Sequence, residues 1–560
     1  MINISSVVVL LGLFTGFVSS FPHQESGRTH KSRNAPGPVV DLGYAKYQGS
    51  TDLSTNISIF SGIRYAGPPT GSLRFQAPQA PAKVDGVQQA TSPPPQCYQA
   101  GEGTAQTNPF IRNPLLKKRY STLTSEDCFV SVPDIGMVDG LPVVVWIHGG
   151  GYGYHSHHLG GNISVFPQED LVVDSQNHVI VVSIQYRLGA FGFLAGPSVK
   201  KSGALNAGLL DQHFALQWVQ QYYLARYIGS FRLVTSLFGG DPSKVTIWGE
   251  SVGAGSVLQH VVAYGGRTNP PLFRAAITSS TYLPPQYAAN DPIPTVWYRF
   301  LPLTSCDSAS DTFACLLAVD SDTLNNANDA IASSAFYGTF VFVPVVDGTF
   351  IVERPTVTLD RQVVNGDVLL SVTNTFEGRT FTIPSETNTF DFIRQLFPFL
   401  SAKQIDLAAG YYTALNSTLP TPLDQSIAIM GESIFICPTY LLLKAFNGKS
   451  WKGEFAIPPG NHGDDVYYYF LDNNPPFNNA DFIKSFSQSF MNIAVSLDPN
   501  RKFDPTNPTP AWDHWNSDET EMLFNKTSTD GPDIRAVRTD SRLLERCAYV
   551  LLHLSMLSEY

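Results

Sequence analysis

Residues 245–262 read VTIWGESVGAGSVLQHVV and contain the sharpest pattern in the chain. A β-branched apolar run at 245–248 leads directly into a Gly-x-Ser-x-Gly turn around Ser251, and apolar residues then recur at helical spacing. Glycines two positions before and after the serine let strand and helix approach closely without Cβ clashes. The turn also places the hydroxyl near a helix N-terminus, whose dipole favours developing negative charge. The pattern predicts that Ser251 is a nucleophile on a tight turn between a strand and a helix.

Apolar runs and helical patterns alternate around this turn. Residues 143–147 (VVVWI) and 178–183 (HVIVVS) are apolar at nearly every position, which is typical of central strands covered by helices on both faces. Residues 209–220 have helical spacing and precede the serine turn. This alternation predicts a doubly wound α/β domain with a large, mostly parallel central sheet and helices on both faces. A serine on such a turn is the arrangement that α/β-hydrolases use.

A run of three glycines follows the strand-like residues 143–147. The segment 148–152 reads HGGGY, and glycines let backbone N–H groups point at a substrate oxygen with no side chain in the way. We assign the oxyanion donors to Gly150, Gly151 and Val252, the residue after the nucleophile. A phosphate-binding loop is disfavoured because no Lys-Ser/Thr pair follows the glycines.

Histidines near the glycine run raise the alternative of a metal site. They are His148, His155, His157 and His158, but no carboxylate or cysteine stands at ligand spacing from them. A histidine patch on the surface beside the site is therefore favoured. The predicted chemistry needs no metal and no cofactor.

The catalytic base is found by elimination. In α/β-hydrolases the order along the chain is serine, acid, histidine. Four histidines follow Ser251, and His260 is too close to it for an acid to intervene. His553 lies in an apolar helical run and is expected in the core, and His514 lies in a Pro-rich stretch. His462, in the loop PPGNHG, is the predicted base because such a loop can project an imidazole toward the serine.

Two acids between the serine and the histidine follow apolar runs. Glu377 comes shortly after 368–372, and Asp347 directly follows 341–346. Spacing only modestly favours Glu377 over Asp347. The acid would hold the tautomer of the imidazole and stabilise the imidazolium without taking the proton.

The composition bounds the class of protein. Hydrophobic residues make up 43% of the 560 positions and aromatic ones 12%, which is enough for a large core and excludes a disordered chain. The 36 basic and 47 acidic residues give a net charge of −11, and no long basic cluster occurs. Nucleic-acid binding is therefore disfavoured.

The amino terminus indicates secretion. Residues 7–18 form one short apolar run followed by small residues, the pattern of a signal peptide over residues 1–20. Residues 21–36 are polar and basic and are expected to form a disordered tail or propeptide. No linker or repeat divides the remainder, so residues 37–560 are expected to form a single domain. No later run approaches 18 apolar residues, so the prediction is a secreted, extracellular protein without an integral membrane span.

Cysteines and sequons fit an oxidising destination. The six cysteines allow fifteen pairings, among which the sequence does not choose; they are Cys97, Cys128, Cys306, Cys315, Cys437 and Cys547. Four Asn-x-Ser/Thr sequons are glycosylation candidates, namely Asn56, Asn162, Asn416 and Asn525.

Several motifs occur in one order along nearly the whole chain after the tail. They are FSGIRYA (60–66), SEDC (125–128), the triple glycine, YRLGAFGF (186–193), GLLDQ (208–212), FGGDP (238–242) and the Ser251 turn. In this set and order they resemble the type-B carboxylesterases, the family that includes cholinesterases and fungal lipases. The resemblance implies hydrolysis of a small-molecule or lipid ester through an acyl-enzyme, with no cofactor.

The resemblance also implies roles for individual residues. Glu377 rather than Asp347 is the acid, because it matches the family's Asn-x-x-Glu-Gly segment. The catalytic residues are then Ser251, Glu377 and His462. Three disulfides follow from the same resemblance, namely Cys97–Cys128, Cys306–Cys315 and Cys437–Cys547, which leaves no free thiol.

Two alternatives remain open on the same fold. The first is a lipase acting at an oil–water interface with residues 97–128 as a lid, which apolar residues within that loop favour. The second is a non-catalytic adhesion or binding protein, but such relatives typically lose the nucleophile. The oligomeric state is open.

Two departures from the family pattern stand out. The strand leading from Cys128 to the triple glycine is short for the family. Residues 222–237 (YYLARYIGSFRLVTSL) form about a dozen extra residues where a short connection is expected, and they are more apolar than a surface loop. They form either a helix extension that shapes the pocket or an error in the gene model. We favour the second, because nothing in the segment has turn chemistry that would return the chain to Phe238.

Overall fold

The computed structural model describes residues 34–108, 124–128, 130–135, 140–154, 168–220, 237–286, 295–470 and 475–555. Several predictions fall outside these ranges. They are the signal peptide, the tail up to residue 33, the middle of the proposed lid (109–123), His155, His157, His158, Asn162 and residues 222–236.

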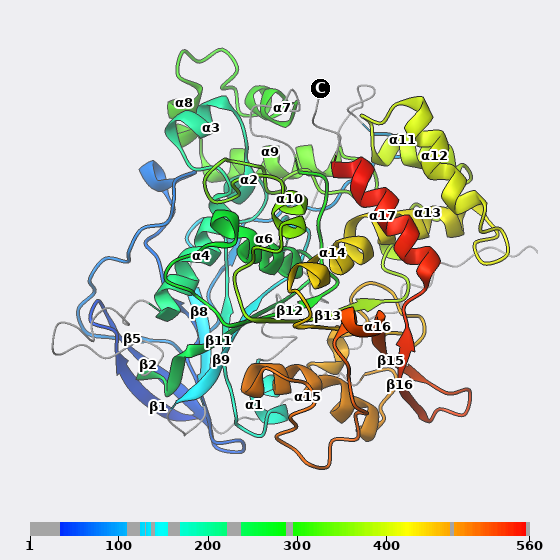
Figure 1. Ribbon diagram of the computed structural model, residues 1–560. Helices are drawn as coiled ribbons and strands as arrows, with labels where there is room; N and C mark the ends of the chain where they lie inside the picture. The colour runs from blue at the N-terminus through cyan, green and yellow to red at the C-terminus, as the bar shows by residue number, and fades with distance from the viewer. Residues whose placement is uncertain are drawn as a thin grey trace, which may run out of the picture.

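One fourteen-stranded sheet runs through the molecule (Figure 1). Its strands are β1 (Asn34–Asp41), β2 (Lys46–Asp52), β3 (Ile57–Ile59), β4 (Ile63–Arg64), β5 (Val87–Gln89), β8 (Val130–Ile135), β9 (Leu141–Ile147), β10 (Ile180–Ile184), β11 (Gly240–Glu250), β12 (Ala275–Ser279), β13 (Val368–Asn374), β14 (Ser450–Phe455), β15 (Thr520–Lys526) and β16 (Pro532–Arg538). Their order is β1-β2-β3-β8-β10-β9-β11-β12-β13-β14-β15-β16, with β4 beside β8 and β5 beside β2. From β10 to β15 all neighbours are parallel, whereas β8–β10 and β15–β16 are antiparallel. A second sheet pairs β6 (Gln96–Cys97) with β7 (Thr124–Ser125).

Helices fill the connections between the strands. They are α1 (Glu169–Asp174), α2 (Gly189–Phe193), α3 (Pro197–Ser202), α4 (Ala207–Gln220), α6 (Val252–Gly266), α7 (Thr295–Leu303), α8 (Thr312–Ala318), α9 (Ser321–Ser333), α10 (Pro355–Asp360), α11 (Thr389–Leu396), α12 (Ala402–Thr413), α13 (Pro422–Gly431), α14 (Cys437–Ala445), α15 (Ala480–Ser496), α16 (Trp515–Asp518) and α17 (Ser541–Ser555). Short helical turns are η1 (Gly71–Leu73), η3 (Arg379–Phe381), the π-helical η4 (Glu432–Ile436) and η5 (Val466–Tyr468). Capping boxes begin two of these helices, with Ser401 before α12 and Thr421 before α13, because each side chain satisfies an orphan N–H of the first turn.

The core forms two layers, one on each face of the sheet. Side chains alternate along β9, so Val143, Val145 and Ile147 belong to the layer that contains the apolar face of α6. Val144 and Trp146 belong to the opposite layer, together with the phenylalanines of α15. Every residue of β9, β10 and β12 is buried, as expected for parallel strands covered on both faces. The architecture is therefore the predicted one, a large sheet with a parallel centre and helices on both sides.

The cysteines form three disulfides, Cys97–Cys128, Cys306–Cys315 and Cys437–Cys547. This is the pairing that the family resemblance implies. Three sequons lie within the described residues. Asn56 and Asn416 are exposed in turns, whereas Asn525 is half-buried on β15.

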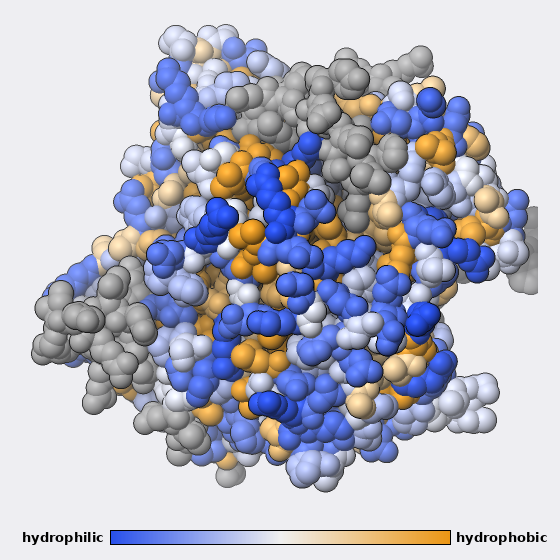
Figure 2. All heavy atoms as spheres, in the orientation of Figure 1, coloured by the Kyte–Doolittle hydropathy of each residue, from blue (hydrophilic) through white to orange (hydrophobic). Residues whose placement is uncertain are grey.

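The helical run Pro422–Ala445 is the one described stretch long and apolar enough to cross a membrane by length and composition. Within it, 83% of the most apolar window is buried inside the protein, as for a helix of a core. Figure 2 shows one face of the molecule, on which apolar residues form separate patches among hydrophilic ones. The burial of the run identifies it as a core element of this fold.

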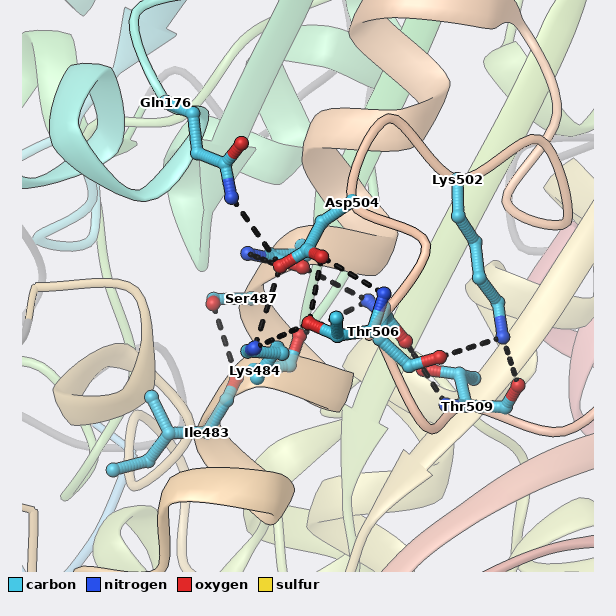
Figure 3. Close-up of polar contacts among 10 residues, drawn as sticks. Gln176, Ile483, Lys484, Ser487, Lys502, Asp504, Thr506 and Thr509 are labelled. Atoms are coloured by element: carbon cyan, nitrogen blue, oxygen red, sulfur yellow. Dashed lines mark hydrogen bonds and ion pairs between the residues drawn. The ribbon is translucent and has the colours of Figure 1, made fainter.

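The loop that leads from α15 toward β15 is held by one carboxylate (Figure 3). Asp504 accepts hydrogen bonds from the backbone N–H of Thr506 at 2.9 Å and from its hydroxyl at 2.7 Å. Its other oxygen faces Gln176 and Lys484, each at 3.3 Å. The hydrogen bonds from Thr506 lower the pKa of Asp504 to about 2. The carboxylate therefore joins this loop to α15 and to the turn after α1.

Two histidines, His213 on α4 and His260 on α6, stack on each other in an aromatic cluster. The rings of His213 and His260 lie 6.2 Å apart, and Phe350 contacts both. Burial lowers the pKa of His213 to about 4. Since an unfolded histidine titrates near 6.5, the unfolded chain binds more protons between these values, and stability decreases as the pH falls from about 6.5 to 4.

His213→Phe is therefore expected to weaken the acid sensitivity of the fold. Between pH 7 and pH 5, the free energy of unfolding of the wild type should fall by about 2 kcal/mol more than that of the variant. Urea unfolding at both pH values measures this difference. Equal pH dependence in the His213 variant and the wild type would contradict the prediction.

Candidate active site

Ser251 lies between β11 and α6 in a strained backbone conformation. Its φ is +58° and its ψ is −123°, outside the regions that residues with a Cβ ordinarily adopt. The flanking glycines allow the tight turn. A Cβ on Gly249 would lie 2.3 Å from the backbone of Gly253, and one on Gly253 would lie 2.0 Å from the carbonyl oxygen of Ile147. Both positions therefore require glycine because the strand and the helix approach each other closely, as predicted.

The structure brings Ser251, His462 and Glu377 into one chain of hydrogen bonds. The Nε2 atom of His462 lies 2.9 Å from the Ser251 hydroxyl, and its Nδ1 atom lies 2.6 Å from Glu377 Oε2. Ser251 comes from the turn after β11, Glu377 from the loop after β13, and His462 from the loop after β14. Because β11 to β14 are parallel, these loops meet at one edge of the sheet.

The carboxylate of Glu377 is buried and held from its other side. Its Oε1 atom accepts hydrogen bonds from the Ser280 hydroxyl at 2.7 Å and from the backbone N–H of Asn374 at 2.6 Å. Asp347, the other acid that spacing allowed, lies elsewhere. It binds Asn206 at 2.6 Å and caps the turn at Thr349. The run 341–346 before it contains no regular strand, and several of its valines line a cavity described below.

The glycine-rich turn lies beside the first turn of α6. Gly150 and Gly151 have φ values of +110° and +65°, and the Gly150 carbonyl accepts the N–H groups of Gly153 and Tyr154. His148 is buried, stacks on Tyr186, and its carbonyl accepts the Tyr186 hydroxyl at 2.8 Å. No described residue accepts a hydrogen bond from the N–H of Gly150 or Gly151. These donors and the N-terminus of α6 can therefore serve an oxygen that arrives with a substrate.

Gly151→Ala is expected to lower kcat by a factor of about 10² to 10³. A Cβ at this position would lie 1.9 Å from the Phe340 ring, and the positive φ disfavours any side chain. Either effect moves the N–H groups of the turn. Steady-state kinetics with a chromogenic ester measures the loss.

The matched control for that variant is Gly71→Ala. Gly71 has a similar φ of +57°, but a Cβ there meets no atom within 4 Å. This control should keep wild-type kcat at a modest cost in stability. A Gly151 variant with nearly unchanged kcat would contradict the assignment of the turn.

Two further carboxyl groups, which no motif in the sequence marks, lie close to the histidine. Glu250 Oε1 lies 3.4 Å from His462 Nε2, and neither of its oxygens has a hydrogen-bond partner in the described residues. Burial, followed by the charges of Asp465 and Glu377, raises the pKa of Glu250 well above its usual range. Burial also raises the pKa of Asp465, which accepts hydrogen bonds from Asn374 and Tyr469, to about 6. In the sequence, only the position of Glu250 directly before Ser251 could have indicated that one of these carboxyl groups lies at the site.

A cavity of about 190 Å³ lies near His462, and aromatic rings stand between the two. The rings of Phe435 and Phe381 lie 4.4 Å and 5.0 Å from that of His462. Tyr282 packs on Phe435, and Tyr282 and Phe340 line the cavity. Most other lining residues are apolar, including Phe193, Val341, Val343, Leu396, Phe397 and Ile434. The cavity suits an apolar part of a ligand.

Comparisons with known proteins point to one family. The sequence model of the carboxylesterase family matches residues 36–540. A secreted triacylglycerol lipase of Gibberella zeae is 29% identical over 537 residues, covering 86% of each chain. Lipase 4 of Diutina rugosa is 32% identical over 492 residues, covering 79% of this chain and 84% of the lipase. The crystal structure of EstA from Aspergillus niger superposes with a TM-score of 0.79 at 28% identity, covering 94% of this chain and 99% of that one.

Proposed function

The chain belongs to the carboxylesterase family and is a carboxylic ester hydrolase, and from this premise we propose that it cleaves esters through an acyl-enzyme on Ser251. His462 acts as the general base, and Glu377 orients it. Gly150, Gly151 and Val252 supply the oxyanion donors. The single observation that supports this proposal most is the continuous chain Ser251–His462–Glu377, with contacts of 2.9 Å and 2.6 Å.

The proposed reaction has two similar halves. The Ser251 oxygen bonds to the ester carbonyl carbon while its proton passes to His462 Nε2. The carbonyl oxygen, now an anion, receives hydrogen bonds from the backbone N–H groups. His462 then gives its proton to the departing alcohol oxygen as the carbon–oxygen bond breaks. Water repeats the sequence on the acyl-enzyme, which releases the acid and restores Ser251.

We assign the apolar cavity to the acyl chain of the substrate. The cavity adjoins the aromatic residues around His462, and Phe340 both lines it and packs against Gly151 of the proposed oxyanion turn. An acyl group on Ser251 would thus have its carbonyl at the turn and its apolar chain directed toward the cavity. Relatives named as lipases share this family, so long acyl chains are the favoured substrates.

We also propose that the mature protein is extracellular and has one domain. The signal-peptide pattern at 1–20 and the three disulfides support secretion. Relatives of the chain are named as secreted lipases. A single sheet that joins strands from Asn34 to Arg538 supports one domain over residues 37–560, after a tail at 21–36.

One assay set tests the proposed function. The secreted protein is incubated with short and long p-nitrophenyl esters and with emulsified triglyceride. Hydrolysis of the soluble esters is expected. Additional activity that rises sharply once triglyceride forms an emulsion would identify the interfacial lipase, whereas activity on soluble esters alone would identify an esterase. No hydrolysis of any ester would overturn the proposal in favour of a non-catalytic protein on the same fold.

A further inference from the structure

A second, smaller apolar cavity adjoins the first at one shared lining residue. It measures about 30 Å³ and lies among α11, α12, α13 and α17, which gather on one side of the molecule (Figure 1). Its lining residues are Ile393, Phe397, Leu400, Ala408, Tyr412, Ile429, Ser433, Tyr549 and Val550. Among the described residues, Phe397 alone lines both cavities.

Phe397 is fixed as a wall between the two spaces. It directly follows the last residue of α11, and its N–H donates to the Ile393 carbonyl at 2.8 Å. Only 6% of the residue is exposed to solvent. Leu396 and Pro398 on either side of it also line the larger cavity. The ring therefore separates the proposed acyl site from the smaller cavity.

Among the described residues that line the smaller cavity, no side-chain hydroxyl is free to bind a ligand or water. Each side-chain hydroxyl on its lining residues is already bonded elsewhere. Ser433 donates to the Met430 carbonyl, Tyr412 donates to Glu432, and Tyr549 donates to the Gln404 carbonyl. Such a space is suited to hydrocarbon and not to water.

The walls of the smaller cavity are braced, so the cavity would persist if the ring were removed. Arg546 donates to both carboxylate oxygens of Glu432 at 2.8 Å and 2.6 Å, which joins α17 to η4. The disulfide Cys437–Cys547 joins the same two regions. Surroundings held in this way relax only partly when a buried side chain is truncated.

We propose that Phe397 sets the maximum acyl length of the substrate by closing the acyl cavity against the smaller one. This inference rests on the proposed function, in which the acyl chain of the ester occupies the larger cavity. Removing the ring joins the two spaces and admits further methylenes into an apolar, dry environment. Each additional buried methylene is expected to raise kcat/KM about fourfold.

The test measures kcat/KM for a series of p-nitrophenyl esters of increasing acyl length. Two esters are compared, the one that the wild type prefers and one whose acyl chain is two carbons longer. For Phe397→Ala, the kcat/KM of the longer ester divided by that of the shorter one should rise on the order of tenfold. Phe397→Leu keeps an apolar side chain and is therefore less prone to misfold. It should shift the acyl-length profile in the same direction, but by a smaller amount. Adding Ala408→Leu to Phe397→Ala refills the smaller cavity and should restore the wild-type profile.

Phe392→Ala is the matched control. It truncates a buried ring on α11, the helix that ends just before Phe397, and this ring lines neither cavity. The profile should therefore keep its shape. Active Phe397 variants with the wild-type length profile would overturn the inference and leave the proposed function intact. A wild type that hydrolyses no ester of the series would overturn the proposed function as well.

Discussion

Ser251→Ala is expected to lower kcat for a p-nitrophenyl ester by a factor of about 10⁶. The substitution removes the one oxygen that lies 2.9 Å from His462 Nε2, so no acyl-enzyme can form. A small residual rate should remain, because the backbone donors of Gly150, Gly151 and Val252 are unchanged. Steady-state kinetics on the purified variant, with unfolding measured in parallel, checks both parts.

A second substitution at the same position separates chemistry from folding. Ser251→Gly should be as inactive as Ser251→Ala, yet more stable than it by about 1 kcal/mol, because glycine adopts a φ of +58° without a Cβ clash. Turnover by either variant within a hundredfold of the wild type would remove Ser251 from the proposed role.

Glu377→Gln is expected to lower kcat by a factor of about 10⁴. The amide has nearly the same shape as the carboxylate, but it can donate a hydrogen bond to His462 Nδ1. This favours the tautomer that carries its proton on Nε2, which cannot accept the Ser251 proton. The amide also lacks the charge that stabilises the imidazolium. Activity is measured with a soluble ester, and the fold by thermal unfolding.

Asp347→Asn is the matched control for the acid. It makes the same change at Asp347, the other acid that spacing along the chain allowed. The carboxylate of Asp347 accepts hydrogen bonds from Asn206 and Thr349 instead. Nearly full activity is expected from it. A Glu377 variant within tenfold of the wild type, or an equal loss in the Asp347 variant, would reverse the assignment.

The central strands could be predicted because burial on both faces leaves a continuous apolar pattern. The runs 143–147, 178–183 and 245–248 lie within or overlap β9, β10 and β11. The strand before Ser251 begins earlier than predicted, at Gly240, where polar residues lie outside the continuous apolar run. Apolar character alone misleads at 341–346, because those valines line a cavity and do not form a strand.

Contacts between distant loops could not be predicted in the same way. The acid stayed ambiguous from spacing because both candidates follow apolar runs. Spacing favoured Glu377 only modestly, and the family resemblance then pointed to it. Asp465 and Ser280 act through hydrogen bonds that join separate loops, and no local pattern encodes such pairs. Phe397 resembles any other core phenylalanine in the sequence, since its place between two cavities depends on four helices.

Labelling with a serine-directed organophosphate tests whether the acyl-enzyme forms on Ser251. The wild-type protein is titrated with the reagent, residual ester hydrolysis is followed, and the labelled peptide is identified by mass spectrometry. We expect one adduct per chain, located on Ser251, with activity lost in proportion to labelling and no adduct on Ser251→Ala. Complete inactivation with the label on another residue, or full activity with Ser251 labelled, would contradict the claim that an acyl-enzyme forms at Ser251.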